Sequence, residues 1–368
     1  MTAKKTGASV DLSKVHNDPA VATFQIGYRQ YLNAEGTLAA DLPDFATERD
    51  TMVAMYRCAV LTRTFDAKAV ALQRTGKLGT FPSSLGQEAV SVAIGAAMSA
   101  EDVLLTTYRE QGAHFFRGVT LKEVFMFWGG DERGCKTSGP KDDFPFSIPI
   151  ASHTTHAVGV ATAMKLRGQA HVAVCVLGDG ATSKGDFYEA INLAGVWQLP
   201  VVFVVINNGW AISVPRHKQS SCETLAQKSI AGGFEGEQVD GNDIIAVRTA
   251  MDEALAQARA GLGPSLIEAL TYRLSDHTTA DDASRYRAED DVSARWKKDP
   301  LVRLRNYLVG QDWWGKSDEE SLLGECKSRV NEAADAYLDT TPQAAEAKFE
   351  SLYDDLPEVI SAQRQWVK

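Results

Sequence analysis

Two almost wholly apolar runs stand out in the pattern of hydrophobic and polar positions along this chain. Residues 171–177 and 200–206 have the length and composition of strands that are buried on both faces of a sheet. Residues 184–197 lie between them and carry apolar side chains at helical spacing. A strand–helix–strand unit of this length implies parallel strands joined by a right-handed crossover. The pattern therefore predicts an α/β protein built on a parallel sheet.

The pattern on either side of this unit extends the same architecture. Helical spacing begins near Thr47 and continues to Gly76, and small apolar residues at 86–97 predict a closely packed, buried helix. The other expected elements are a helix at 154–166, a strand ending at 238–239, a helix at 243–260 capped by Asn242 or Asp243, a strand at 265–271 and a helical stretch over 293–365. Together they predict a doubly wound, mostly parallel sheet with an amino-terminal arm and a helical carboxy-terminal region.

We expect three parts along the chain. Residues 1–45 form an extension with short strands around a central turn, and residues 46–310 form the α/β domain. Residues 311–368 form a helical segment packed on that domain. Two polar stretches, 129–149 and 275–291, lack apolar periodicity and are predicted to be long exposed loops, which in compact domains are usually functional.

Composition narrows the classes of protein that remain. The net charge of −10 argues against a nucleic-acid-binding surface, which would carry a basic patch. The 5 cysteines are scattered without CxxC spacing, as in a reducing compartment. The amino terminus has neither the apolar core of a signal peptide nor an arginine-rich amphipathic pattern. Apolar runs of about seven residues are far shorter than the roughly 20 that span a bilayer. We therefore expect a cytoplasmic protein without nucleic-acid or membrane partners, and not a mitochondrial one.

Polar residues at the ends of the two strands suggest the chemistry. Gly178-Asp179-Gly180 follows the first strand, and Asn207-Asn208 follows the second. A carboxylate and a carboxamide at neighbouring strand ends can hold Mg²⁺, which prefers oxygen ligands shared with phosphates. The glycines allow a sharp turn, and the following helix, expected to begin near Ser183, would face an anion with its amino terminus. These residues predict a diphosphate-bearing cofactor at the carboxyl edge of the sheet.

Two other interpretations of these strand ends stay open at this point. The glycines could form an ordinary tight turn of another doubly wound enzyme. They could also begin a nicotinamide-binding fingerprint, but Ser183 stands in place of the third glycine. The second strand ends in Asn207-Asn208, not in the acidic residue that would bind a ribose.

At this stage the chain resembles a known family, the thiamine diphosphate enzymes, and within it the alpha subunits of 2-oxo acid dehydrogenase complexes. The resemblance begins with the cofactor motif over 178–213, GDGATSKGDFYEAINLAGVWQLPVVFVVINNGWAIS. It continues through 61–88, Tyr108-Arg109, 239–247, 268–287 and 299–308, so that roughly residues 45–310 are covered. The fold that it implies is the doubly wound sheet of the thiamine diphosphate-binding fold.

The resemblance also implies roles for individual residues. Mg²⁺ would be bound by Asp179, Asn208 and the backbone carbonyl of Trp210. The diphosphate would be held by Tyr108, Arg109, His277 and the backbone of Gly180 and Ala181, and the aminopyrimidine ring would meet backbone groups of Ile148 and Ile150. His277 would also assist catalysis, since a histidine can donate or accept a proton near neutral pH.

Departures from the family pattern limit what can be transferred. Many relatives carry a further active-site histidine before the aminopyrimidine-binding segment, whereas residues 129–147 contain none. His153 follows that segment, and a packed interior position is the more usual interpretation of such a histidine. Thr278 stands where some relatives have a phosphorylated serine, which puts kinase control in doubt. We also expect Arg285 and Arg287 to pair with Asp281 or Asp282 and order the loop when cofactor is bound.

The family further implies partners and a reaction. The glutamate that activates the cofactor would come from a beta subunit, which gives an α2β2 heterotetramer bound to a lipoyl-bearing acyltransferase core. The expected activity is oxidative decarboxylation of a 2-oxo acid with reductive acylation of the lipoyl group, as in pyruvate dehydrogenase (acetyl-transferring). Pyruvate is the first expectation for the substrate, and a branched-chain 2-oxo acid is the alternative.

Overall fold

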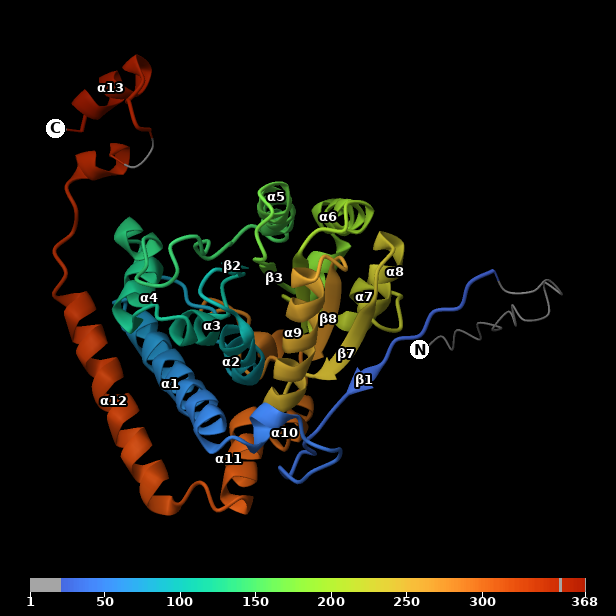
Figure 1. The fold of residues 1–368 in the computed structure, drawn as a ribbon. Helices are drawn as coiled ribbons and strands as arrows, with labels where there is room; N and C mark the ends of the chain where they lie inside the picture. The colour runs from blue at the N-terminus through green and yellow to red at the C-terminus, as the bar shows by residue number, and fades with distance from the viewer. Residues whose placement is uncertain (1–20, 351–352, 368) are drawn as a thin grey trace, which may run out of the picture.

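The computed structural model describes residues 21–350 and 353–367. Its centre is a six-stranded sheet with the order β1-β7-β8-β4-β3-β2, in which all neighbouring strands are parallel (Figure 1). The strands are β1 (Tyr28–Arg29), β2 (Val103–Leu105), β3 (Ala173–Gly178), β4 (Val201–Asn207), β7 (Gly236–Asp240) and β8 (Ser265–Leu270), and the small antiparallel pair β5 (Trp210–Ala211) and β6 (Val214–Pro215) lies outside this sheet. The predicted parallel sheet is confirmed, with strand ends shifted by one or two residues.

Helices cover both faces of the sheet. They are α1 (Arg49–Arg74), α2 (Glu88–Ala97), α3 (Gln111–Phe116), α4 (Leu121–Trp128), α5 (Ser152–Leu166), α6 (Gly185–Val196), α7 (Arg216–Gln219), α8 (Ser229–Gly232), α9 (Ile244–Arg259), α10 (Glu289–Trp296), α11 (Pro300–Gly310), α12 (Lys316–Leu338) and α13 (Glu358–Gln365). Asp243 is the residue that caps α9, since its Oδ1 accepts from the N–H groups of Ile245 and Ala246.

Alternate residues of β2, β3, β4 and β8 belong to two different apolar layers, because successive side chains of a strand point to opposite faces. On β3, Val174 and Val176 pack in the layer that contains α1, α2 and α9. Ala173, Cys175 and Leu177 pack in the layer that contains α5 and α6. The doubly wound arrangement that the sequence predicted is therefore confirmed.

The amino-terminal arm adds the last strand of the sheet. Residues 1–20 of the expected extension lie outside the described residues. Tyr28 and Arg29 pair in parallel with β7, and Leu32 and Leu38 form an isolated bridge across the turn that begins at Asn33. The arm is thus joined to one edge of the sheet, whereas β2 forms the other edge.

The carboxy-terminal region is helical, as expected. Helix α12 buries Leu322, Cys326, Val330 and Ala334 in the layer that also contains α1 and α4. Helix α13 has no buried side chain, and it stands apart from the other helices in Figure 1. The division of the chain at residues 45 and 310 stays a prediction.

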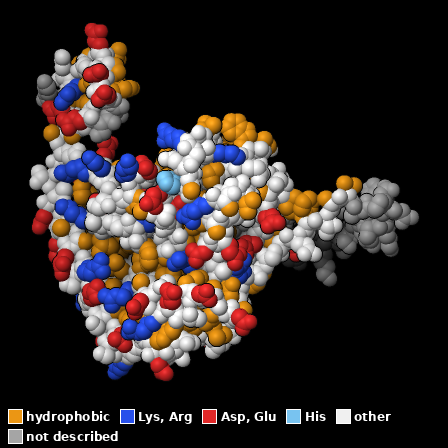
Figure 2. Space-filling view, viewed as in Figure 1, with side chains coloured by type: hydrophobic (Ala, Val, Ile, Leu, Met, Phe, Trp, Pro, Cys, Tyr) orange, Lys and Arg blue, Asp and Glu red, His pale blue; other side chains and the backbone are white. Residues whose placement is uncertain are grey.

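The surface is mixed in charge. Figure 2 shows acidic and basic side chains interspersed over the visible face, with apolar side chains gathered near α6.

The loop after α4 is hydrogen-bonded to the segment that contains β2. Phe144 donates its N–H to the carbonyl of Leu104, and Ser147 does the same to Thr106, so the predicted loop runs beside β2. None of the helices in the described part of the chain combines the length and apolarity that a membrane crossing requires.

The contact between α6 and α8 gives a test of the packing. A Cβ atom on Gly195 would lie 1.7 Å from the carbonyl oxygen of Gly232, whereas one on Gly159 of α5 would meet nothing within 4 Å. We expect Gly195→Ala to lower the free energy of unfolding by about 1–3 kcal/mol, the usual cost of overpacking. Gly159→Ala is the matched control and should raise the free energy of unfolding by roughly 0.5–1 kcal/mol. Urea titrations measure both, and equal stability of the two variants would contradict this packing.

Candidate functional site

Parallel pairing of β3 with β4 brings the two predicted strand-end motifs together. Gly178 is the register partner of Ile206, so Asp179 and Asn208 leave the sheet at the same edge. A cavity of about 190 Å³ opens there. The predicted site residues that line it are Tyr108, Arg109, Ile150, Asp179, Gly180, Ala181, Asn208, Trp210 and His277. Ile148 is the exception, because it lies exposed outside this lining.

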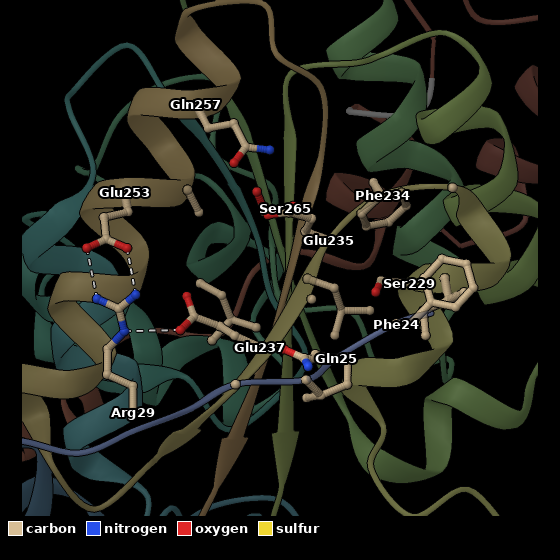
Figure 3. A pocket seen from close by; sticks show the side chains of 18 of the residues that line it. Phe24, Gln25, Arg29, Ser229, Phe234, Glu235, Glu237, Glu253, Gln257 and Ser265 are labelled. Atoms are coloured by element: carbon tan, nitrogen blue, oxygen red, sulfur yellow. Dashed lines mark hydrogen bonds and ion pairs between the residues drawn. The ribbon is translucent and has the colours of Figure 1, made fainter. Parts of the chain in front are cut away.

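A larger groove of about 950 Å³ lies elsewhere, beside the arm at the β1 edge of the sheet. Figure 3 shows Arg29 bonded to Glu237 and Glu253 across part of this groove. None of the predicted site residues lines it. The larger groove is therefore not the candidate site. The smaller cavity at the strand ends is, because the predicted site residues line it.

Asp179 is a buried carboxylate with an unused oxygen. Its side chain is 2% exposed, and its Oδ2 has no hydrogen-bond partner. Burial raises the pKa of this carboxyl to about 6. The residue begins the short 3-10 turn Asp179–Ser183, and α6 follows only at Gly185, slightly later than predicted. An unpaired buried carboxylate is costly, so the free oxygen fits a cation ligand.

Asn208 provides a neutral oxygen in the same cavity. Its Nδ2 donates to Oε1 of Gln87 at 3.1 Å, and its Oδ1 accepts the N–H of Trp210 at 3.2 Å. Within residues 21–350 and 353–367, no group of three or more His, Cys, Asp or Glu forms a metal cluster. A cation held here would therefore combine Asp179 and Asn208 with backbone and phosphate oxygens, a donor set that fits Mg²⁺.

Arg109 and His277 supply hydrogen-bond donors to the lining, and Arg109 also supplies a positive charge. Arg109 is 6% exposed and donates to the carbonyl of Ser83 and to both the carbonyl and Nδ1 of His277, at 2.7, 2.7 and 2.8 Å. Since a guanidinium can only donate, Nδ1 accepts and the neutral ring carries its proton on Nε2. Burial, followed by the charges of Arg109 and Arg273, lowers the pKa of His277 to about 4.

The loop that carries His277 is more tightly packed than the sequence suggested. Arg273 is fully buried and donates to the carbonyl of Ile212 at 2.9 Å and to the hydroxyl of Tyr286 at 2.8 Å. Asp281 accepts from that hydroxyl and from the backbone N–H of His277. Arg287 donates to the carbonyls of Arg273 and Leu274, and the ion pairs expected for the cofactor-bound loop stay a prediction.

Three buried polar residues of the lining were not predicted as site residues. Gln87 leaves its Nε2 unpaired, and Glu110 accepts from the Thr107 hydroxyl while burial raises its pKa to about 7. His153 bonds through Nε2 to the carbonyl of Val176 at 2.7 Å, and its Nδ1 has no partner. Burial lowers the pKa of His153. The sequence held a signal for two of these residues. Gln87 lies in the 61–88 segment that carries the family resemblance, and Glu110 directly follows Arg109.

The fold and the cavity define an α/β protein with a buried, oxygen-rich site at its strand ends. Comparisons with known proteins show the family to which the chain belongs. The family model described as the dehydrogenase E1 component matches residues 56–346. The 3-methyl-2-oxobutanoate dehydrogenase subunit alpha of Mycobacterium tuberculosis is 40% identical over 336 residues, which cover 91% of this chain and 90% of that relative. The pyruvate dehydrogenase E1 component subunit alpha of Staphylococcus aureus is 38% identical over 369 residues, or 100% of this chain and 98% of that relative. That of Acholeplasma laidlawii is 42% identical over 286 residues, or 77% and 83%.

The chain therefore belongs to the dehydrogenase E1 component family, as an alpha-type subunit of the 2-oxo acid dehydrogenases. The predicted resemblance is confirmed at this level. Membership of the family implies thiamine diphosphate as the cofactor, and the strand-end cavity contains oxygen donors and an arginine that fit its diphosphate and cation.

The contact between His277 and Arg109 should depend on pH. The pKa of His277 is lowered from 6.5 to about 4, so protonation is easier when the loop opens. The contact should be strongest above pH 6.5 and should weaken as the pH falls towards 4. NMR titration of ¹³C-labelled histidine, with His277→Gln to assign the signal, should give a midpoint near 4. A midpoint above 6 would contradict the buried, neutral imidazole.

Proposed function

We propose that the protein is the alpha subunit of a pyruvate-type 2-oxo acid dehydrogenase component that binds Mg²⁺ and thiamine diphosphate. One observation carries the proposal: the unpaired carboxylate oxygen of buried Asp179 shares a cavity with Asn208, Arg109 and His277. Anion-binding and cation-binding groups thus line a single small space at the carboxyl edge of a parallel sheet, where α/β proteins bind ligands.

Each part of the lining has a proposed role. Mg²⁺ would be held by the side chains of Asp179 and Asn208 and by the carbonyl of Trp210. The diphosphate would be held by Tyr108, Arg109, His277 and the backbone of Gly180 and Ala181, while backbone groups of Ile148 and Ile150 would meet the aminopyrimidine ring. Arg109 suits phosphate because its charged guanidinium makes strong hydrogen bonds to anionic oxygens. Gly180 suits a close backbone approach, since a Cβ there would already lie 2.8 Å from Cβ of Ala211.

When bound, thiamine diphosphate supplies the nucleophile and the electron sink for decarboxylation of a 2-oxo acid. Orientation and proton handling remain the task of the protein. His277 holds its proton on Nε2 because Arg109 occupies Nδ1, so Nε2 can donate to an anionic oxygen near the substrate. The packed loop around Arg273 holds this imidazole in place.

A beta subunit is proposed to complete the site. The carboxylate that activates the cofactor would come from it, because Glu110 lies beside Arg109 at the diphosphate end and both of its oxygens accept from Thr107. Ile148 and Ile150 are exposed near the cavity. Exposed apolar residues also cover α6, namely Tyr188, Leu193 and Val196, with Trp197 at its end (Figure 2). Apolar surface of this kind supports an α2β2 assembly that serves a lipoyl-bearing acyltransferase core.

Pyruvate is proposed as the substrate. The pyruvate dehydrogenase subunit of Staphylococcus aureus aligns with the whole chain, arm included, which supports this choice. A branched-chain 2-oxo acid is the alternative, since the Mycobacterium tuberculosis relative named for 3-methyl-2-oxobutanoate is 40% identical. A nicotinamide-dependent reaction has less support, because Asn207 at the end of β4 is bonded to Glu268 and offers no free acid for a ribose.

Removal of the Asp179 carboxylate tests the cofactor assignment. We expect Asp179→Ala to lower Mg²⁺-dependent affinity for thiamine diphosphate by more than the roughly 10–100-fold that indirect changes at metal sites cause. Isothermal titration calorimetry measures this affinity. Asp186→Asn is the matched control, since Asp186 is an exposed carboxylate on α6 paired with Lys184, and its loss should change affinity less than about fivefold. Binding of NAD⁺ without any metal would instead favour a nicotinamide enzyme.

Substrate choice is tested on the chain co-purified with its beta subunit. Pyruvate should give a kcat/KM at least about 10-fold above that of 3-methyl-2-oxobutanoate, within the range that a few methylene groups produce in an apolar pocket. Reduction of an artificial electron acceptor reports the decarboxylation. The reverse preference would assign the branched-chain reaction, and activity of the isolated chain would contradict the need for a second subunit.

A further inference from the structure

Glu268 places a carboxylate in the middle of the sheet, between the largely apolar strand β4 and the more polar strand β7. It lies on β8, its side chain is 0% exposed, and its register partners are Val205 on β4 and Gln238 on β7. The ion pairs formed by residues 21–350 and 353–367 do not include it. Burying an ionised carboxylate without a cation is costly unless hydrogen bonds satisfy it fully. An apolar residue would fill this position at lower cost, so the carboxylate needs another explanation.

Four donors surround this carboxylate. Oε1 accepts from Nδ2 of Asn207 at 2.7 Å. Oε2 accepts from the backbone N–H groups of Leu225 and Ala226 at 2.7 and 2.9 Å, and from Nε2 of Gln238 at 2.9 Å. All four partners donate, and a carboxylate is the side-chain group that can accept from all of them at once.

The bond to Asn207 fixes the orientation of a carboxamide that can otherwise flip. With Nδ2 directed to Glu268, the Asn207 oxygen faces the other way and accepts the N–H of Gly209 at 3.2 Å. Gly209 has a φ of 86°, a left-handed conformation that favours glycine. This residue lies between Asn208 and Trp210, the two proposed metal ligands of the turn.

We propose that Glu268 is a positioning residue of the Mg²⁺ site. Its charge selects the orientation of the Asn207 carboxamide, and Asn207 in turn holds Gly209 and the flanking metal-binding turn. Glu268 does not touch the cavity itself, since it is absent from the lining. The metal-binding part of this inference rests on the proposed function, whereas the effect on the turn concerns the chain alone.

A pair of substitutions separates this role from simple packing. In Glu268→Gln an NH₂ group replaces one carboxylate oxygen, and it must face a partner that also donates. At the Oε1 position the NH₂ group would face Nδ2 of Asn207, while the remaining oxygen keeps its three other partners. The Asn207 carboxamide would then flip and set its Nδ2 against the N–H of Gly209. Adding Asn207→Asp restores the match, because one Asp oxygen accepts from the glutamine and the other accepts from Gly209. The double variant keeps the net charge of the natural protein.

The test uses the chain co-purified with its beta subunit. It measures Mg²⁺ affinity at saturating thiamine diphosphate by calorimetry, and amide hydrogen exchange of residues 207–211 without ligand. Glu268→Gln should weaken Mg²⁺ binding about 10–100-fold, as changes to partners of metal ligands typically do, and should speed exchange in the turn. In the double variant the Mg²⁺ affinity and the exchange rate of the turn should return to within about threefold of the natural protein, because residues 268 and 207 are directly coupled. Glu237→Gln is the matched control. It removes a carboxylate from the adjacent strand β7, where Glu237 is paired with Arg29, and it should leave the Mg²⁺ affinity and the exchange rate unchanged.

Each outcome decides the matter. Unchanged binding and exchange in Glu268→Gln, or a double variant as impaired as the single one, would overturn the positioning role. If Glu268→Gln fails to fold, a folded and binding double variant still supports the inference, and failure of both variants to fold counts against it. If the natural chain, co-purified with its beta subunit, binds no thiamine diphosphate with Mg²⁺, the proposed function fails, and the exchange data alone then decide whether Glu268 holds the turn.

Discussion

The register of parallel strands is the constraint on which the rest of this structure depends. Four strands adjacent in the sheet, β8, β4, β3 and β2, all end at one edge. The segments that follow them supply His277, the Asn208 turn, Asp179 and the pair Tyr108-Arg109, respectively. Residues scattered over much of the chain therefore meet around one small cavity. A slip of one residue between β3 and β4 would turn their side chains to the wrong layers and separate Asp179 from the Asn208 turn.

The charges of the site are arranged before any ligand arrives. Burial and neighbouring arginines keep the pKa of His277 low and its ring neutral, while burial raises the pKa of the Asp179 and Glu110 carboxyls. In water these polar groups would be hydrogen-bonded to solvent. Here they are largely buried, and the Asp179 oxygen without a partner lowers the stability of the fold. Such fixed groups reorganise little when an ion or phosphate binds, and this is the usual benefit of a preorganised polar site.

Much of the architecture and the centre of the site followed from the sequence. Uninterrupted apolar runs marked β3 and β4, and glycine and amide residues at their ends pointed to Asp179 and Asn208. The supporting residues did not follow, because their partners lie far away along the chain. Gln87 meets Asn208 across 121 positions. The 275–291 loop looked exposed because its order comes from buried Arg273 and from hydrogen bonds, neither of which produces an apolar period.

The amino-terminal arm has a consequence for the solubility of the molecule. Strand β1 is two residues long, yet it occupies the side of β7 that would otherwise present free backbone donors and acceptors. Arg29 places a charged, ion-paired side chain at this boundary. Short, charged edge strands are how natural sheets avoid templating the strands of other molecules. A chain truncated past Arg29 would keep its core and its cavity. The backbone edge of β7 would then be exposed, and the protein would be prone to self-association.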